Sequence, residues 1–201
     1  MWGEPSAETS LTRKTSSSTS LPASRRVLLL VDFINPLRFD GALELAPMAV
    51  TAARATARFK RRFSEEGWTS IYVNDNFGEW QSDVPRLLKE CRRSGAAAAQ
   101  LARLLAPSRE DLIVLKPRHS GFYQTPLEML LDDLKAKELI IVGLSTDYCV
   151  QCTAMDAYVR GYRVSVPADC TAAETVRRRD EALCWMKDAL KARINPVDPG
   201  R

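Results

Sequence analysis

The sequence predicts one α/β domain built around a central, mainly parallel β-sheet flanked by helices. From Arg26 onward, short apolar runs alternate with longer segments of helical period, which is typical of consecutive β-α-β units. The apolar runs are continuous, as expected for parallel strands that are buried on both faces. A length of 201 residues suits one such domain and is short for two.

Apolar runs are the predicted strands, and helical segments separate them. The runs are Val27–Val31, Thr69–Val73, Leu112–Leu115, Leu139–Val142 and Tyr162–Val166. Between the first two runs, one helical face carries alanines and phenylalanines, and a glycine follows where that helix can end. These residues are Ala52, Ala55, Phe59, Phe63 and Gly67.

Two capping boxes predict where later helices begin. Thr125, Pro126 and Glu128 supply a capping threonine, a proline suited to the first helical position and a glutamate at the third. A stripe follows at Leu127, Leu130, Leu131 and Leu134. Thr171 and Glu174 repeat the box before a helix that carries Val176, Leu183, Met186 and Leu190. Further helices are predicted from about Cys149 to Gly161 and over Ala96–Ala106.

Both ends of the chain are predicted to lie outside the domain. Between Ser6 and Ser20, ten of fifteen residues are Ser or Thr, which leaves too little apolar surface to offset the entropy of ordering. We therefore expect a disordered tail at residues 1–24, a folded domain at 25–195 and a C-terminal tail at 196–201.

Composition excludes several classes of protein. The net charge of +4, from 29 basic and 25 acidic residues, is too weak to indicate a nucleic-acid partner. The longest apolar run, Val27–Val31, is far shorter than the roughly 18 residues that span a bilayer, so no membrane partner is expected. Five cysteines without regular spacing favour a reducing, cytoplasmic compartment. The single histidine, His119, excludes a metal site that needs two histidines from this chain.

Polar residues follow the predicted strands at the edge where an open parallel sheet binds its ligands. Asp32 follows the first run, Asn74 and Asp75 follow the second, and Lys116 follows the third. The fourth run leads into a turn that reaches Cys149. An acid, a cation and a thiol are therefore predicted to lie on one edge of the sheet.

These three groups can form a nucleophilic site. Cys149 opens a predicted helix, where the N-terminal amides and a nearby lysine would lower the pKa of its thiol. Asp32 could take the thiol proton while Lys116 stabilises the charged pair, and backbone amides between Gly143 and Cys149 could hold an oxyanion. His119 is expected at the surface or behind the site, although its place near Lys116 leaves a catalytic role open. The residues indicate an acyl-transfer or hydrolytic cysteine enzyme.

Three motifs resemble the isochorismatase-like cysteine hydrolases, a superfamily that includes nicotinamidases. Residues 143–150, Gly-Leu-Ser-Thr-Asp-Tyr-Cys-Val, resemble its nucleophile region, which continues through Thr153-Ala154, Asp156-Ala157, Gly161-Tyr162 and Asp169. Residues 31–35, Val-Asp-Phe-Ile-Asn, resemble the first-strand motif with its aspartate. Lys116 to Phe122, together with Thr125, resembles the lysine segment. The resemblance covers about residues 27–192, with the motifs in the family's order.

The resemblance implies a three-layer, Rossmann-like fold with a catalytic triad of Asp32, Lys116 and Cys149. It also implies a cis peptide bond between Leu144 and Ser145, so that the amides of Ser145 and Cys149 form the oxyanion hole. The Cys149 thiolate would attack a carbonyl carbon, expel an amine or ammonia, and form an acyl-enzyme that water hydrolyses. Family members are often dimers or tetramers, so a homo-oligomer is expected.

Departures from the family pattern narrow the substrate. Nicotinamidases bind a metal through an aspartate and histidines after the second strand, but Asp75 has no histidine near it in the sequence. True isochorismatases lack the nucleophilic cysteine, which this chain has at Cys149. We therefore expect a hydrolase without cofactor or metal that cleaves a C–N bond of a small non-peptide amide, carbamoyl or ureido compound. The predicted substrate contacts are Asn76, Trp80, Phe122 and Tyr148.

Other functions stay open. A relative that retains the triad without catalysis would be a binding or interaction module, and a metal-dependent nicotinamidase is a further alternative. Cys149 and Cys152 form a C-x-x-C pair, which alone suggests a redox dithiol but leaves Asp32 and Lys116 unexplained. The cysteines expected to be structural are Cys91, Cys152, Cys170 and Cys184.

Overall fold

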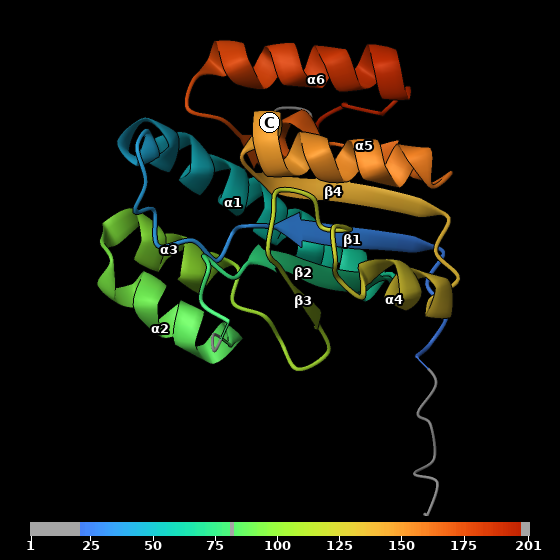
Figure 1. Cartoon of the computed structure of the whole chain (residues 1–201), viewed down its shortest axis with the longest axis horizontal. Helices are drawn as coiled ribbons and strands as arrows, with labels where there is room; N and C mark the ends of the chain where they lie inside the picture. Colours follow the sequence, from blue (N-terminus) through green and yellow to red (C-terminus); the bar gives the residue numbers. More distant parts are fainter. Residues whose placement is uncertain (1–20, 81–82, 198–201) are drawn as a thin grey trace, which may run out of the picture.

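The computed structural model describes residues 21–80 and 83–197, and there helices cover both faces of one parallel sheet (Figure 1). The strand order is β3-β2-β1-β4-β5, and the short β6 pairs with the end of β4. Every pairing between these strands is parallel, so the predicted α/β fold is confirmed. The strands are β1 (Arg26–Val31), β2 (Thr69–Asp75), β3 (Leu112–Lys116), β4 (Glu138–Leu144), β5 (Arg163–Ser165) and β6 (Thr171–Ala172).

Two clusters of buried side chains form the core, one on each face of the sheet. Alternate residues of β1 divide between them, because successive side chains of a strand point to opposite faces. One face is covered by α1 (Ala42–Glu65), α2 (Val84–Arg93) and α3 (Ala96–Leu104). The other is covered by α4 (Leu127–Asp133), α5 (Gln151–Val159) and α6 (Val176–Leu190). The domain therefore has three layers.

The helices between β1 and β3 agree with the sequence in part. In α1, Ala52, Ala55 and Phe63 are buried as predicted, and Phe59 packs against the same cluster. Of the two helices after β2, only α3 was predicted. The segment of α2 escapes the hydrophobic pattern because five of its ten residues are charged. Its start is set instead by Asp83, whose side chain accepts a hydrogen bond from the Arg86 amide at 2.8 Å.

The start of α6 differs from the prediction. Thr175 caps this helix by accepting a hydrogen bond from the Arg178 amide at 3.1 Å, and Val176 is exposed. The predicted capping residue, Thr171, belongs to β6 and donates its hydroxyl hydrogen to the Gly143 carbonyl. Thr171 therefore pairs with the end of β4, although the local sequence pattern predicts that it caps the helix.

Two further helix starts shift by short distances. The helix predicted from about Cys149 begins earlier, as the π-helical turn η1 (Thr146–Val150), which continues into α5. The helix α4 begins at Leu127, where the Thr125 hydroxyl accepts a hydrogen bond from the Leu127 amide at 3.2 Å. Cys149 thus lies within the first turn of a longer helical segment.

The predicted N-terminal tail, residues 1–24, lies outside the described residues except for its last four. Among these, Ser24 is buried and its amide donates to the Leu134 carbonyl at 2.7 Å. Of the predicted tail at 196–201, residues 198–201 lie outside the described part, and the Val197 amide donates to Asp169 at 3.0 Å. Across the described ranges, no helix is both long and apolar enough to cross a membrane.

Candidate active site

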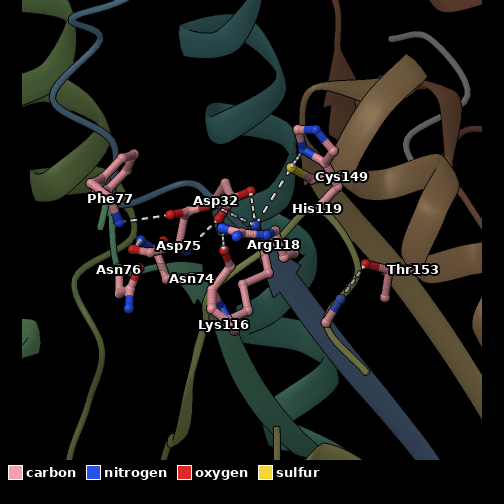
Figure 2. A network of polar contacts seen from close by, with 12 residues as sticks. Asp32, Asn74, Asp75, Asn76, Phe77, Lys116, Arg118, His119, Cys149 and Thr153 are labelled. Carbon is pink, nitrogen blue, oxygen red and sulfur yellow. Dashed lines mark hydrogen bonds and ion pairs between the residues drawn. The ribbon is translucent and has the colours of Figure 1, made fainter. Parts of the chain in front are cut away.

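Asp32, Lys116 and Cys149 meet at the carboxyl edge of the sheet (Figure 2). Asp32 follows β1, Lys116 is the last residue of β3, and Cys149 lies in η1 after β4. The Nζ atom of Lys116 lies 2.8 Å from Oδ2 of Asp32 and 3.5 Å from Sγ of Cys149. Because the Lys116 side chain is completely buried, its ammonium group is held by these partners and not by bulk water.

A second carboxylate balances the charge of Lys116. Oδ2 of Asp75 lies 3.2 Å from Nζ, and Oδ1 accepts a hydrogen bond from the Phe77 amide at 2.6 Å. The Asp75 amide also donates to Oδ1 of Asp32 at 2.6 Å. The sequence pattern did not predict that Asp75 would pair with Lys116. The contact follows from the strand register, which places Asp75 opposite Lys116 across β2 and β3.

The chain after β1 is held so that the Asp32 carboxylate reaches Lys116. Asp32 has a φ of 50°, and its amide donates to the Val73 carbonyl at 3.1 Å. Asn74 at the end of β2 then fixes the next residues, because Oδ1 accepts from the Ile34 amide at 3.1 Å and Nδ2 donates to the Ile34 carbonyl at 2.9 Å. Asp32 is only 4% exposed in this arrangement.

The surroundings of the Cys149 thiol raise its pKa. Burial raises the pKa of Cys149, and the Asp32 carboxylate raises it further, which outweighs the lowering effect of Lys116. Burial also raises the pKa of Asp32 against the influence of Lys116. For Lys116, burial lowers the pKa, but Asp32, Cys149 and Asp75 outweigh burial and leave it raised. The expected lowering of the Cys149 pKa is therefore wrong for the free protein.

The turn that carries Cys149 is fixed by close packing against its neighbours. The Leu144–Ser145 peptide bond is cis. Gly143 has a φ of 138°, and a Cβ there would lie 2.0 Å from the Val31 carbonyl oxygen, so this position requires glycine. The Thr171 hydroxyl donates to the Gly143 carbonyl at 2.8 Å and lies 2.9 Å from the Thr146 hydroxyl. Hydrogen bonds from Thr171 of β6 therefore fix the start of the turn that carries Cys149.

Hydrogen bonds within the turn and from α6 hold the rest of it. The amides of Tyr148 and Val150 both donate to the Ser145 carbonyl at 3.2 Å. The Arg178 Nε of α6 donates to Asp147 at 2.6 Å, and the same guanidinium lies 5.2 Å from the centre of the Tyr148 ring. The C-terminal helix thus holds the two residues that directly precede Cys149.

A cavity of about 310 Å³ opens beside Cys149. Its lining combines the two carboxylates, residues of the turn that carries Cys149 and three partly exposed aromatic rings, at Phe39, Phe77 and Tyr148. Within the described residues, the lining includes no lysine or arginine. The full lining is Asp32, Asn35, Phe39, Leu45, Asp75, Phe77, His119, Leu144, Ser145, Tyr148 and Cys149.

Of the four predicted substrate contacts, Tyr148 lines this cavity and the other three do not. The structure corrects the prediction for Phe122, which is buried in the core with its ring centre 4.7 Å from the Arg160 guanidinium. Trp80 is 81% exposed. Asn76 is buried, and its Oδ1 accepts a hydrogen bond from the Gly78 amide at 2.9 Å, so it shapes its own loop.

His119 lies on the exposed side of the Cys149 sulfur, away from Lys116 (Figure 2). Its Nδ1 atom is 3.6 Å from Sγ, and its ring packs against Tyr148 with centroids 5.7 Å apart. His119 also borders a second hollow of about 610 Å³, whose lining includes Met155 and Trp185. The histidine is exposed, as expected, and it also contacts the thiol.

Nicotinamidases, which the sequence motifs resemble, bind a divalent metal, but the residues at this edge of the sheet could not coordinate one. Asp75 is the counterpart of their metal-binding aspartate. One of its carboxylate oxygens pairs with the Lys116 ammonium group, and the other accepts a hydrogen bond from the Phe77 amide. The nearest imidazole, His119, contacts Cys149 instead. Among the described residues, no three His, Cys, Asp or Glu side chains form a group that could hold a metal ion.

Known proteins share both sequence and fold with this chain. The model of the isochorismatase domain family matches residues 26–194. The chain is 34% identical to the uncharacterized isochorismatase family protein YaaI of Bacillus subtilis (strain 168), over 84% of this chain and 92% of that protein. It is 33% identical to a ureidoacrylate amidohydrolase, RutB, of Methylorubrum extorquens, over 74% of this chain and 70% of that protein.

Solved structures show the same fold. The N-carbamoylsarcosine amidase from Thermoplasma acidophilum matches with a TM-score of 0.67 and 24% identity, over 88% of this chain and 99% of that chain. The nicotinamidase SaPncA from Staphylococcus aureus matches with a TM-score of 0.66 and 23% identity, over 87% of this chain and 99% of that chain.

Proposed function

Since this chain belongs to the isochorismatase family, we propose that it is a hydrolase that cleaves a C–N bond of a small non-peptide amide, carbamoyl or ureido compound. One observation carries the proposal: the buried Nζ of Lys116 contacts both the Asp32 carboxylate and the Cys149 sulfur. Similarity to proteins named as a ureidoacrylate amidohydrolase and an N-carbamoylsarcosine amidase supports the substrate class.

In the first half of the reaction, Cys149 becomes acylated. Asp32 takes the thiol proton as the sulfur attacks the carbonyl carbon, and the raised pKa of Asp32 makes it a stronger base for this step. Lys116 stays charged beside the new thiolate and stabilises it. Asp32 then gives the proton to the leaving nitrogen as the C–N bond breaks. The product is a thioester on Cys149.

The backbone around the cis peptide supplies the oxyanion hole in this proposal. Ser145 and Cys149 both line the cavity, so their amides are the candidates to stabilise the negative charge on the carbonyl oxygen. Their positions depend on the turn that Gly143 and Thr171 hold in place. Fixed amides of this kind stabilise the transition state without having to reorganise during the reaction.

The cavity favours a small substrate with an apolar part. The two carboxylates in its lining, Asp32 and Asp75, are both paired with Lys116. The rings of Phe39 and Phe77 offer an apolar surface. We therefore expect small amide, carbamoyl and ureido compounds with an apolar substituent to be the better substrates.

Ammonia release tests the proposed function. Wild-type protein and Cys149→Ala are assayed on primary amides, carbamoyl amino acids, ureido acids and nicotinamide, with and without chelator. Cys152→Ala is the matched control, because Cys152 lies three residues on, is exposed and does not line the cavity. Turnover that is lost in Cys149→Ala, retained in Cys152→Ala and unchanged by chelator supports the proposal. Turnover by Cys149→Ala, or chelator-sensitive nicotinamide hydrolysis, would contradict it.

A further inference from the structure

The Cys149 sulfur lies between two unlike environments (Figure 2). On its buried side are Lys116, at 3.5 Å, and Asp32. On its exposed side is Nδ1 of His119, at 3.6 Å. His119 is exposed and lines the same cavity as the thiol, and it is the single histidine of the chain. The nucleophile therefore has a potential proton acceptor on each side.

The second half of the reaction needs a base that can reach a water molecule in the cavity. Once Cys149 is acylated, its sulfur carries no proton, and water has to approach the thioester from the cavity. Asp32 and His119 both line this cavity, but Asp32 is only 4% exposed, its Oδ1 accepts a hydrogen bond from the Asp75 amide and its Oδ2 pairs with Lys116. His119 faces the cavity, and with its proton on Nε2 its Nδ1 is an acceptor for a water molecule. Because Nδ1 lies 3.6 Å from the sulfur, it is the imidazole atom that can reach a water molecule near the thioester.

We propose that His119 is the general base of deacylation. The inference rests on the proposed function, since it requires a thioester on Cys149. One O–H bond of the water breaks, its proton goes to Nδ1, and the oxygen forms a bond to the thioester carbon. The C–S bond then breaks and its electron pair stays on the sulfur. Nδ1 returns the proton to that sulfur, which restores the thiol and releases the carboxylic acid.

Two bases therefore divide the work at one sulfur atom. Asp32 moves the thiol proton to the leaving nitrogen, and His119 moves the proton of the attacking water. Tyr148 is a positioning residue in this scheme, because its ring packs against the imidazole with centroids 5.7 Å apart. The division predicts that loss of His119 slows deacylation far more than acylation.

Stopped-flow kinetics with p-nitrophenyl acetate separates the two steps, because the p-nitrophenolate leaving group departs without needing a proton. The burst of p-nitrophenolate reports acylation, and the steady rate that follows reports deacylation. The variants are His119→Gln and the matched control Arg118→Gln, which alters the neighbouring exposed residue that does not line this cavity. Intact-protein mass spectrometry measures the acetylated fraction, and Cys149→Ala identifies the acylated residue.

His119→Gln should retain the burst, lose about 100-fold in the steady rate and accumulate acetyl-enzyme, since general bases contribute about 10²–10⁴-fold. Arg118→Gln should behave as wild type. Imidazole added to acetylated His119→Ala, after the excess p-nitrophenyl acetate has been removed, should speed the loss of the acetyl group measured by mass spectrometry, which keeps the test decisive if the glutamine variant folds poorly. An equal loss of both phases, or wild-type deacylation in His119→Gln, would overturn the role of His119. A protein that releases no p-nitrophenolate and forms no acetyl-Cys149, in the wild type and in His119→Gln alike, would instead overturn the proposed function.

Discussion

Replacing Lys116 by methionine should destabilise the protein, and the loss should grow as the pH rises. Lys116→Met keeps most of the side-chain volume but removes a completely buried ammonium group that lies 2.8 Å from Asp32 and 3.2 Å from Asp75. Asp32 is itself only 4% exposed. The variant therefore leaves a carboxylate in the core without its counter-charge.

The distances set the size of the effect. At an effective dielectric constant of about 20, two unit charges separated by 2.8 Å attract by about 6 kcal/mol, and desolvation of both groups offsets part of this. Removing one partner of a buried ion pair typically destabilises a protein by about 3–5 kcal/mol. The Asp75 contact adds less, because that side chain is 25% exposed and partly screened. We expect a loss of about 3–5 kcal/mol at neutral pH.

The pH dependence follows from the pKa of Asp32. Burial already raises this pKa above its ordinary value of 3.8, and loss of the lysine raises it further. Below the ordinary value, the carboxyl group is protonated in the folded and unfolded chains alike, so the missing cation matters least there. As the pH rises, the unfolded chain releases this proton while the folded variant retains it, so the free energy of unfolding falls.

Urea denaturation of wild type and Lys116→Met between about pH 4 and pH 8 measures this difference. Lys89→Met in α2 is the matched control, because Lys89 is exposed, and it should change the free energy of unfolding by less than about 0.5 kcal/mol. A loss in Lys116→Met that is the same at every pH would refute the electrostatic reasoning and indicate a packing effect.

Three other substitutions probe the turn, the thiol and the core. Asp32→Asn should lower the pKa of Cys149 yet abolish amide hydrolysis, because the carboxylate both raises that pKa and takes the proton; an unchanged pH profile of iodoacetamide alkylation would contradict this. Thr171→Val should reduce the free energy of unfolding by about 1–3 kcal/mol and slow turnover, since the Gly143 carbonyl loses a donor; a wild-type melting curve and kcat would count against it. Phe122→Ala should lose about 3–5 kcal/mol of stability with KM unchanged, because the ring lies in the core and not at the cavity; a KM raised more than a few-fold would return Phe122 to the substrate site.

The strands were predictable because a strand buried on both faces of a sheet is a continuous run of apolar residues in the sequence. Residues Val27–Val31 are all completely buried, and a run of apolar residues allows few other placements. The start of α6 was not predictable from the same kind of local pattern. Thr171 and Glu174 match a capping box, but the pairing of Thr171 with Gly143 is a tertiary contact between residues far apart in the chain.

The position of the candidate site was predictable because Asp32, Lys116 and Cys149 each follow a strand of the same parallel sheet or end one. The neutralisation of Lys116 by a second carboxylate was not predictable, because the contact between Asp75 and Lys116 depends on the register of β2 against β3. The raised pKa of Cys149 depends on depth of burial and on the carboxylate beside it, which spacing along the chain does not reveal.

The substrate contacts were the least predictable part, because they depend on the path of loops. Phe122 follows the lysine segment in sequence, but the loop folds back against α5, where the Gly121 amide donates to the Thr153 hydroxyl at 3.0 Å. A Cβ at Gly121 would lie 2.6 Å from the Val73 side chain, so the backbone packs directly on β2. This close approach carries Phe122 into the core.

The contacts of Thr171 and Arg178 also bear on the order in which the protein is made. Asp32, Lys116 and Cys149 all precede residue 150, whereas both residues that secure the nucleophile turn come after residue 170. On the ribosome, the growing chain therefore contains all three of these side chains before it contains Thr171 and Arg178. Because synthesis proceeds from the N-terminus, the turn that carries Cys149 gains these two contacts only after β6 and the start of α6 have been made, although neither residue is a proposed reacting group.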